Sequence, residues 1–374
     1  MKTAVTELLG CEFPILAFSH CRDVVAAVSK AGGFGVLGAV AHTPEQLEID
    51  LAWIDAEVGD RPYGVDLLLP QKYVGADEGG LDVADLAQLL PPEHREFVDD
   101  ILERYAVPEL PDDETPRGMS LNVSPQGYEP LLDVAFAHPI RLIASALGPP
   151  PADVIERSRA AGVKVAALAG KTVHAVKHAE AGADIIIAQG SEAGGHTGEV
   201  GTMVLVPEVV DAVAPVPVLA AGGIANGRHM AASMALGAAG VWTGSVWLTT
   251  AEAETEPTVK QKFLDATSSD TLRSRSITGK PARMLRTPWT DEWERKDGPG
   301  TLPMPLQPML VGSALNRINR SAATPGSGAA ELATYFIGQV VGSIDSVRPA
   351  DRVVLDMVEE FIDTIDGLAE GLST

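Results

Sequence analysis

The chain has 374 residues, 45% of them hydrophobic, which is enough for one large α/β domain with an appendage. Its 28 basic and 51 acidic residues give a formal net charge of −23, which argues against nucleic acid or an anionic membrane as a partner, since both need clustered Lys and Arg. The two cysteines lack CxxC spacing, so they indicate neither a disulfide framework nor a metal site. The N-terminus does not resemble a secretory signal and no apolar run is long enough to span a membrane, so we expect a cytoplasmic protein.

Short apolar runs alternate with helical patterns along most of the chain. The expected strands, in chain order, are residues 13–18, 34–38, 62–69, 141–146, 163–169, 183–187, 216–221 and 239–242. Helices are expected between them at residues 23–31, 44–58, 152–161, 172–181 and 228–236. Eight such units in this order favour a closed (β/α)8 TIM barrel of the α/β class over an open sheet.

Three segments lie outside this alternation. Residues 70–137 form a long insertion after the third strand, with a helix expected near 92–105 and a linker rich in Pro and Asp at 108–116. Such an insertion is either a lid over the active face or an inert elaboration, including a homodimer contact. We therefore expect a barrel over residues 1–250, a small helical cap over 251–328, and C-terminal helices over 329–374 that pack back on the barrel.

The loop after the sixth strand carries the clearest chemical signal, in the sequence AQGSEAGGHTG. Four glycines between Gly190 and Gly198 oppose an ordinary helix and let backbone N–H groups approach a ligand closely. The same loop holds one imidazole, His196, at the carboxyl end of a strand, where barrel enzymes keep their catalytic groups. Because a histidine titrates near neutral pH, His196 is the first candidate for a general base.

Two further loops predict a phosphate site. Gly222 and Gly223 follow the seventh strand, and Thr243-Gly244-Ser245 follows the eighth. Small residues with free backbone N–H groups at consecutive strand ends can hold a phosphate, and in TIM barrels these two loops are its usual place. A phosphorylated cofactor is therefore expected beside His196.

The segments AQGSEAGGHTG and PVLAAGGIANGRHMAASMALGAAGVWTGS resemble the nitronate monooxygenase (2-nitropropane dioxygenase) family. Its members are FMN-dependent TIM barrels, and FMN-dependent enoyl-ACP reductases are close relatives. The resemblance covers residues 6–70 and 141–286. The two glycine loops are specific for this superfamily, but they do not distinguish its oxidases from its reductases.

The resemblance implies roles for individual residues. His196 matches the catalytic histidine, the alternative being a histidine that only hydrogen-bonds the glycine loop. Glu192 is better interpreted as a structural residue that ties down loop N–H groups. Lys171 could offset charge on the reduced flavin, bind substrate, or be an ordinary surface lysine. The residues expected to contact FMN are Ala17, Asp66, Lys171, Gln189, Gly194, Gly222, Gly223, Trp242, Thr243, Gly244 and Ser245.

Two regions depart from the family pattern. Asp66 stands where the third strand usually ends in an asparagine near the flavin, and a carboxylate there is unfavourable beside a reduced flavin unless it is paired or protonated. After the first strand the chain has Phe18-Ser19-His20-Cys21-Arg22 where Ala-Pro-Met is frequent. His20 and Arg22 could bind an anionic substrate group, or instead cap the next helix and pair with Asp23.

Three functions stay open. The first is an FMN-dependent oxidoreductase that oxidises alkyl nitronates with O2, with His196 as base. The second is an FMN-dependent NAD(P)H reductase of an enoyl thioester, an acyl-CoA or a quinone. The altered loop after the first strand and the insertion at 70–137 favour this function, because both suggest a substrate larger than a nitroalkane. The third is a barrel without catalysis that binds a phosphate ligand, against which the intact His196 loop argues.

Overall fold

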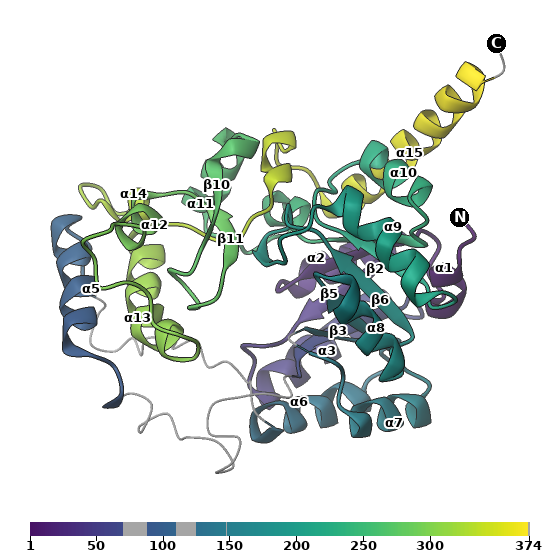
Figure 1. The fold of residues 1–374 in the computed structure, drawn as a ribbon, viewed down its shortest axis with the longest axis horizontal. Coiled ribbons are helices and arrows are strands. Elements are labelled where there is room, and N and C mark those ends of the chain that lie inside the picture. Colours follow the sequence, from purple (N-terminus) through teal and green to yellow (C-terminus); the bar gives the residue numbers. More distant parts are fainter. Residues whose placement is uncertain (70–87, 110–124, 147, 373–374) are drawn as a thin grey trace.

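A computed structural model describes residues 1–69, 88–109, 125–146 and 148–372, and it shows two bodies side by side (Figure 1). One is a closed barrel of eight parallel strands in the order β1-β2-β3-β4-β5-β6-β8-β9, which confirms the predicted TIM barrel. Its strands are β1 (Ile15–Ser19), β2 (Phe34–Gly38), β3 (Tyr63–Leu68), β4 (Leu142–Ala146), β5 (Lys164–Ala169), β6 (Ile185–Gln189), β8 (Val218–Ala221) and β9 (Gly240–Thr243).

Helices surround the barrel and lie close to the predicted positions. Residues 44–58 and 152–161 form helices with the expected bounds, and Thr43 begins the former with a reciprocal capping pair to Gln46. A short helix, α1 (Ala4–Leu9), closes the amino-terminal end of the barrel with Val5 and Leu9. The outer helices are α2 (Arg22–Lys30), α3 (Pro44–Val58), α6 (Pro125–Ala137), α7 (Ala152–Ala161), α8 (Thr172–Glu180), α9 (Thr202–Val213) and α10 (Gly227–Ala235).

Strand alternation divides the apolar residues between two layers. On β3, Tyr63, Val65 and Leu67 pack outward against α3 and α6. The intervening positions face the barrel interior, whose apolar cluster includes Phe34 of β2 and Leu142 of β4. Asp66 belongs to this inward series, so the strand period alone places it inside the barrel near its carboxyl end.

The insertion after β3 contributes to both bodies. Its last part is α6, which packs on α3 and β3 and therefore serves as the barrel helix between β3 and β4. Its other described helix, α5 (Pro92–Arg104), packs on the second body, which we call the cap. Most of the Pro- and Asp-rich linker predicted at 108–116 lies outside the described residues.

The cap is built of helices and a small sheet that the sequence did not indicate, and α14 at residues 329–332 belongs to it rather than to the C-terminal segment on the barrel. β10 (Thr271–Ser274) and β11 (Ala282–Leu285) form an antiparallel sheet whose third strand is β7 (Gly195–His196), from the glycine loop of the barrel. The cap helices pack around the buried Trp289 and Phe263. They are α5, α11 (Pro257–Asp265), α12 (Pro288–Trp293), α13 (Leu306–Ser321) and α14 (Ala329–Leu332).

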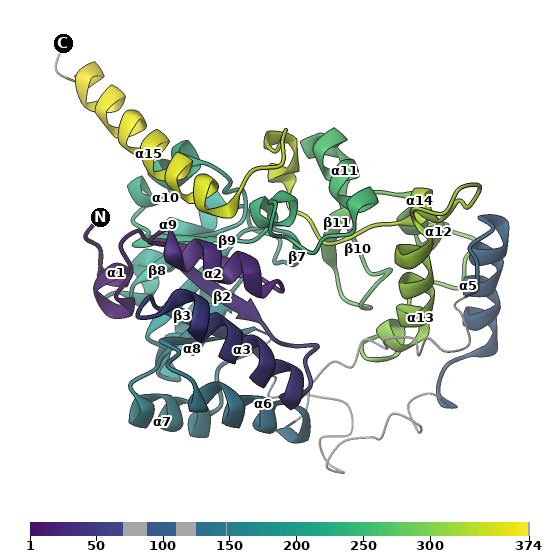
Figure 2. The same cartoon turned by 180° about the vertical axis from the view of Figure 1, so that it is seen from behind.

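The chain ends in a long helix, α15 (Ala350–Leu372), on the side of the barrel away from the cap (Figures 1 and 2). Its first half packs against α10 and α2 through Val354, Met357 and Val358, as expected for a helix returning to the barrel. Its last turns project away from both bodies (Figure 2). Of the helices the structure describes, none combines the length and apolar character needed to cross a membrane.

Candidate active site

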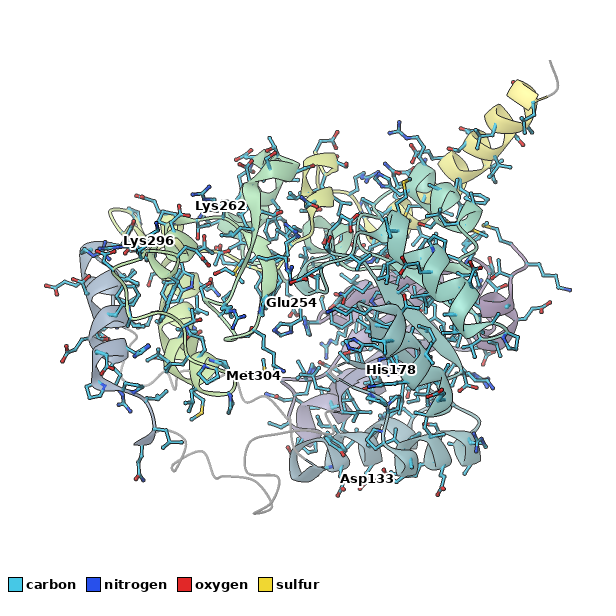
Figure 3. The ribbon with its side chains drawn as sticks, in the orientation of Figure 1. Asp133, His178, Glu254, Lys262, Lys296 and Met304 are labelled. Atoms are coloured by element: carbon cyan, nitrogen blue, oxygen red, sulfur yellow. The ribbon has the colours of Figure 1, made fainter. Side chains whose placement is uncertain are left out.

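A cavity of about 1630 Å³ lies between the carboxyl ends of the barrel strands and the cap. Figure 3 shows Glu254 and Met304, two of its lining residues, where the barrel and the cap face each other. The volume exceeds the range of about 300–1,000 Å³ typical of small-ligand pockets. Of the predicted site residues, the cavity is lined by His20, Asp66, Lys171, Gln189, Gly194, His196, Gly222, Gly223, Trp242, Thr243, Gly244 and Ser245.

Two predicted residues lie elsewhere. Ala17 is fully buried in the core outside the barrel, so its neighbour Phe18 faces the cavity instead. Arg22 does not line the cavity. Its guanidinium donates to Asp50 at 2.9 Å and lies over the ring of Trp53 at 4.7 Å. Arg22 therefore links α2 to α3 and does not reach the mouth of the cavity. The sequence had suggested Asp23 as its structural partner, but the ion pair is with Asp50.

The predicted phosphate loops have the geometry that such a site needs. Gly222 and Gly223 both adopt the left-handed region, with φ of 90° and 73°, which turns the chain sharply after β8. Gly244 separates β9 from η2 (Ser245–Thr249), which begins at Ser245. The backbone N–H groups of Gly222, Gly223, Gly244 and Ser245 have no hydrogen-bond partner among the described residues. A phosphate group on the cofactor could therefore accept from both loops at once.

His196 is held in place by the cap. As part of β7 it pairs with Ala282 on β11, and its Nε2 lies 2.8 Å from Oγ1 of Thr278. The Thr278 hydroxyl donates to the carbonyl oxygen of Lys280 at 3.1 Å, so it is an acceptor toward the imidazole. With the Thr278 hydroxyl donating to Lys280, we assign the ring proton of His196 to Nε2, which leaves Nδ1 as the basic atom.

The protonation state of His196 follows from its surroundings. Burial, and secondarily the positive charge of Lys280, lower the pKa of His196 to about 4. The imidazole is consequently neutral and able to accept a proton above about pH 5. The sequence predicted a histidine at this mouth but not Thr278, which lies 82 residues away and carries no motif that would single it out.

A segment of the cap closes over the glycine loop. A Cβ atom on Gly194 would lie 2.9–3.0 Å from the backbone of Ile337 and Gly338, so only glycine fits there. The N–H of Gly338 donates to Oγ of Ser245 at 2.8 Å, which ties this segment to the second phosphate loop as well. Phe336 of the same segment lines the cavity, with its ring centroid 6.4 Å from that of His196.

Glu192 has the structural role expected of it. Its carboxylate accepts the backbone N–H of Thr202 at 3.0–3.1 Å, which satisfies a donor in the first turn of α9. The hydroxyl of Thr202 in turn lies 2.9 Å from the carbonyl oxygen of Gly222. Glu192 thus links the histidine loop to the first phosphate loop.

Asp66 is the unusual group of the cavity. It is only 7% exposed, and no hydrogen bond or ion pair of its carboxylate is found within the part of the chain that the structure describes. Burial raises the pKa of Asp66 to about 8, with no contribution from a neighbouring charge. The carboxyl is therefore protonated at neutral pH.

The remaining predicted residues differ in character. His20 is exposed to the cavity that it lines, and its Nδ1 is 2.7 Å from the carbonyl oxygen of Gly38. The protein packed around the imidazole lowers the pKa of His20 below its ordinary value, so it is a neutral group at pH 7. Lys171, which precedes α8, is exposed at the mouth together with His174 and Lys177 of that helix. Neither lysine has an ion pair within the described ranges, so both leave their charge available to a ligand.

Comparison with known proteins identifies the family. A family model described as nitronate monooxygenase matches residues 2–360. A Mycobacterium tuberculosis protein named as a monooxygenase is 67% identical over 373 residues, which is 100% of this chain and 99% of the relative. A Staphylococcus saprophyticus protein named as a nitronate monooxygenase is 32% identical over 344 residues, covering 87% of this chain and 89% of the relative.

Solved structures with the same architecture include two with similar sequences. The nitroalkane oxidase from Streptomyces ansochromogenes has a TM-score of 0.79 and 27% identity, covering 98% of this chain and 100% of that one. FabK from Thermotoga maritima has a TM-score of 0.72 and 29% identity, covering 99% of both chains. The similarity in each case extends over the barrel and the cap together.

Proposed function

We propose that this chain, which belongs to the nitronate monooxygenase family and is an FMN-dependent oxidoreductase, oxidises alkyl nitronates or a related substrate with an acidic C–H. The electrons then pass to O2. The observation that supports this most directly is the arrangement of His196. A neutral imidazole with a free Nδ1 lies in the same cavity as two loops suited to a phosphate. When bound, FMN supplies the electron acceptor for the substrate and the electron donor for O2.

The protein's own groups then have distinct tasks. Gly222, Gly223 and Ser245 hold the cofactor phosphate through backbone N–H groups. With a neutral nitroalkane or another substrate that has an acidic C–H, His196 accepts that proton at Nδ1, and Thr278 keeps the imidazole in the tautomer that allows this. An alkyl nitronate has already lost this proton and needs no base for it. Phe336 and the rest of the cap cover the reacting region and limit access of water.

Charge at the mouth fits an anionic substrate such as a nitronate. A protein with a net charge of −23 repels anions at long range, so it needs local positive charge where they enter. Lys171 and Lys177 carry positive charge at the rim of the cavity and have no ion pair among the described residues. The cavity lining also includes Arg273 and the carboxylates of Glu199 and Glu254. His20 and Arg22 do not, since His20 is neutral and Arg22 is paired with Asp50.

The first experiment distinguishes the oxidase from the reductase. The yellow protein is mixed under anaerobic conditions with an alkyl nitronate and, separately, with NADH and NADPH, while flavin absorbance is followed. We expect the nitronate to bleach the flavin and added O2 to restore the colour. Bleaching by NADH or NADPH but not by a nitronate would instead support the reductase, a function that the large cavity also accommodates.

A second prediction concerns Thr278, which positions the base rather than touching substrate. Thr278→Val removes the acceptor for Nε2–H and frees the imidazole to change tautomer, so we expect flavin reduction by a nitroalkane to slow by about tenfold, the worth of one hydrogen bond. Thr278→Ser keeps the hydroxyl and should retain most of the rate. Nitrogen NMR of the His196 ring should show the tautomer shift in the valine variant only. Equal rates in all three proteins would contradict this role.

A further inference from the structure

The carboxyl of Asp66 faces the cavity without a group nearby that would stabilise its negative charge. Strand alternation directs it into the barrel, and its neighbours in register are Gly38 on β2 and Ala144 on β4. Neither neighbour has a side chain that could donate to a carboxylate. The side chain therefore lines the cavity between two small residues, and neither strand neighbour offers it a side-chain hydrogen-bond donor.

The titratable groups around it do not compensate a negative charge. His20, which follows β1, lines the same cavity, but its Nδ1 is 2.7 Å from the carbonyl oxygen of Gly38 and the imidazole is neutral. The loop after β2 brings His42, but that imidazole is 3.0 Å from Asp50. Lys171 follows β5 and is exposed at the rim.

Within the part of the chain that the structure describes, the remaining elements packed on β3 contribute no partner either. β4 has no titratable residue, and α2 and α6 lie against the outer side of the strand. On the far side of the cavity His196 is itself neutral. A buried carboxylate in these surroundings would stay uncompensated, which is costly, whereas the protonated acid is not.

We propose that Asp66 enters the flavin site as a neutral carboxylic acid that donates a hydrogen bond to the isoalloxazine ring, so that FMN binding weakens when this carboxyl loses its proton. Asp66 lies across the barrel mouth from the phosphate loops that follow β8 and β9. A flavin nucleotide with its phosphate on those loops would have its ring, which carries hydrogen-bond acceptors, within the same cavity as Asp66. The acid O–H then supplies the donor that an asparagine amide supplies in the pattern this chain resembles.

This assignment gives the protein a pH dependence that the family's asparagine would not. The pKa of Asp66 is raised to about 8 before the cofactor binds, so the protonated acid predominates at pH 7 and the carboxylate at pH 9. If only the acid donates to the ring, the dissociation constant for FMN should be about tenfold greater at pH 9 than at pH 7. The inference rests on the flavin alone and is independent of which substrate the enzyme oxidises.

The test compares the holoenzyme with Asp66→Asn and Asp66→Ala, measuring FMN released on dilution by its fluorescence between pH 6.5 and 9.5. Any pH dependence from the phosphate, the ring or other residues is common to all three proteins. We expect the ratio of the wild-type dissociation constant to that of Asp66→Asn to be constant below pH 7 and to rise about tenfold by pH 9. Asp66→Ala has no donor at this position, so it should bind FMN more weakly than Asp66→Asn at every pH. The ratio of these two variants' dissociation constants should not change with pH.

Other results would overturn the proposal. A ratio that does not change with pH, or a wild type that binds FMN more tightly as pH rises, excludes a required proton on Asp66. Should the variants fail to fold, infrared spectra of the wild-type holoenzyme decide. A protonated carboxyl C=O band that is present at pH 7 and insensitive to flavin removal, or absent at pH 7, contradicts the hydrogen bond to the ring. A band that shifts when FMN is removed supports it.

Discussion

Replacing His196 by alanine is expected to leave FMN bound and to slow reduction of the flavin by substrate by about 10²–10⁴-fold, the usual contribution of a positioned general base. The cofactor should remain because the phosphate loops follow β8 and β9, while His196 lies on β7 and pairs with the cap. Its pKa of about 4 means that the wild-type base is already neutral across the ordinary range. The measurement is the rate of anaerobic flavin bleaching at saturating nitroalkane.

The pH profile separates a base from a structural histidine. If His196 accepts the proton, the wild-type rate should fall only as the pH approaches about 4–5, and the alanine variant should lose that limb. His138→Ala is a suitable control, since this histidine lies outside the barrel between Asp55 and Glu48 and does not line the cavity. A rate within a few-fold of wild type for the His196 variant would make this residue structural and the proposed mechanism wrong.

Much of the barrel could be predicted because its signals are local. Thr43 and Gln46 form a capping box that begins α3 at the predicted residue, and Pro44 occupies its first turn. The glycines after β6 and β8 mark loops at the mouth, since Gly195, Gly222 and Gly223 adopt backbone conformations that other residues avoid. Each of these features depends on residues that are near one another in the chain.

The parts that could not be predicted depend on long-range contacts. His196 pairs with Ala282 and bonds to Thr278, more than 80 residues later, so no local pattern reveals the strand β7. Arg22 finds Asp50 on the adjacent helix instead of its neighbour Asp23. α6 was hidden within an insertion, because its role as a barrel helix comes from packing on α3 and β3 and not from its sequence pattern.

Changing Gly223 to aspartate is expected to release FMN and give a colourless protein. Gly223 has a φ of 73°, and a Cβ atom there would lie 3.6 Å from that of Glu192, which is ordinary contact. A side chain therefore fits, but the left-handed backbone costs a non-glycine residue about 1–2 kcal/mol. Aspartate also places a negative charge against the cofactor phosphate, where the free N–H groups of the loop would otherwise attract it.

Gly223→Asn separates the charge from the strain. Asparagine has nearly the same size as aspartate and tolerates the left-handed conformation equally well, so the two variants differ mainly in charge. We expect the asparagine variant to retain FMN with reduced affinity and the aspartate variant to bind at least about a hundredfold more weakly, with the difference shrinking at high salt. Affinities of both variants that equal each other and stay near that of the wild type would show that no phosphate lies at this loop. A loss of FMN from both would assign the defect to the backbone. Only a difference that salt screens places the phosphate at Gly223.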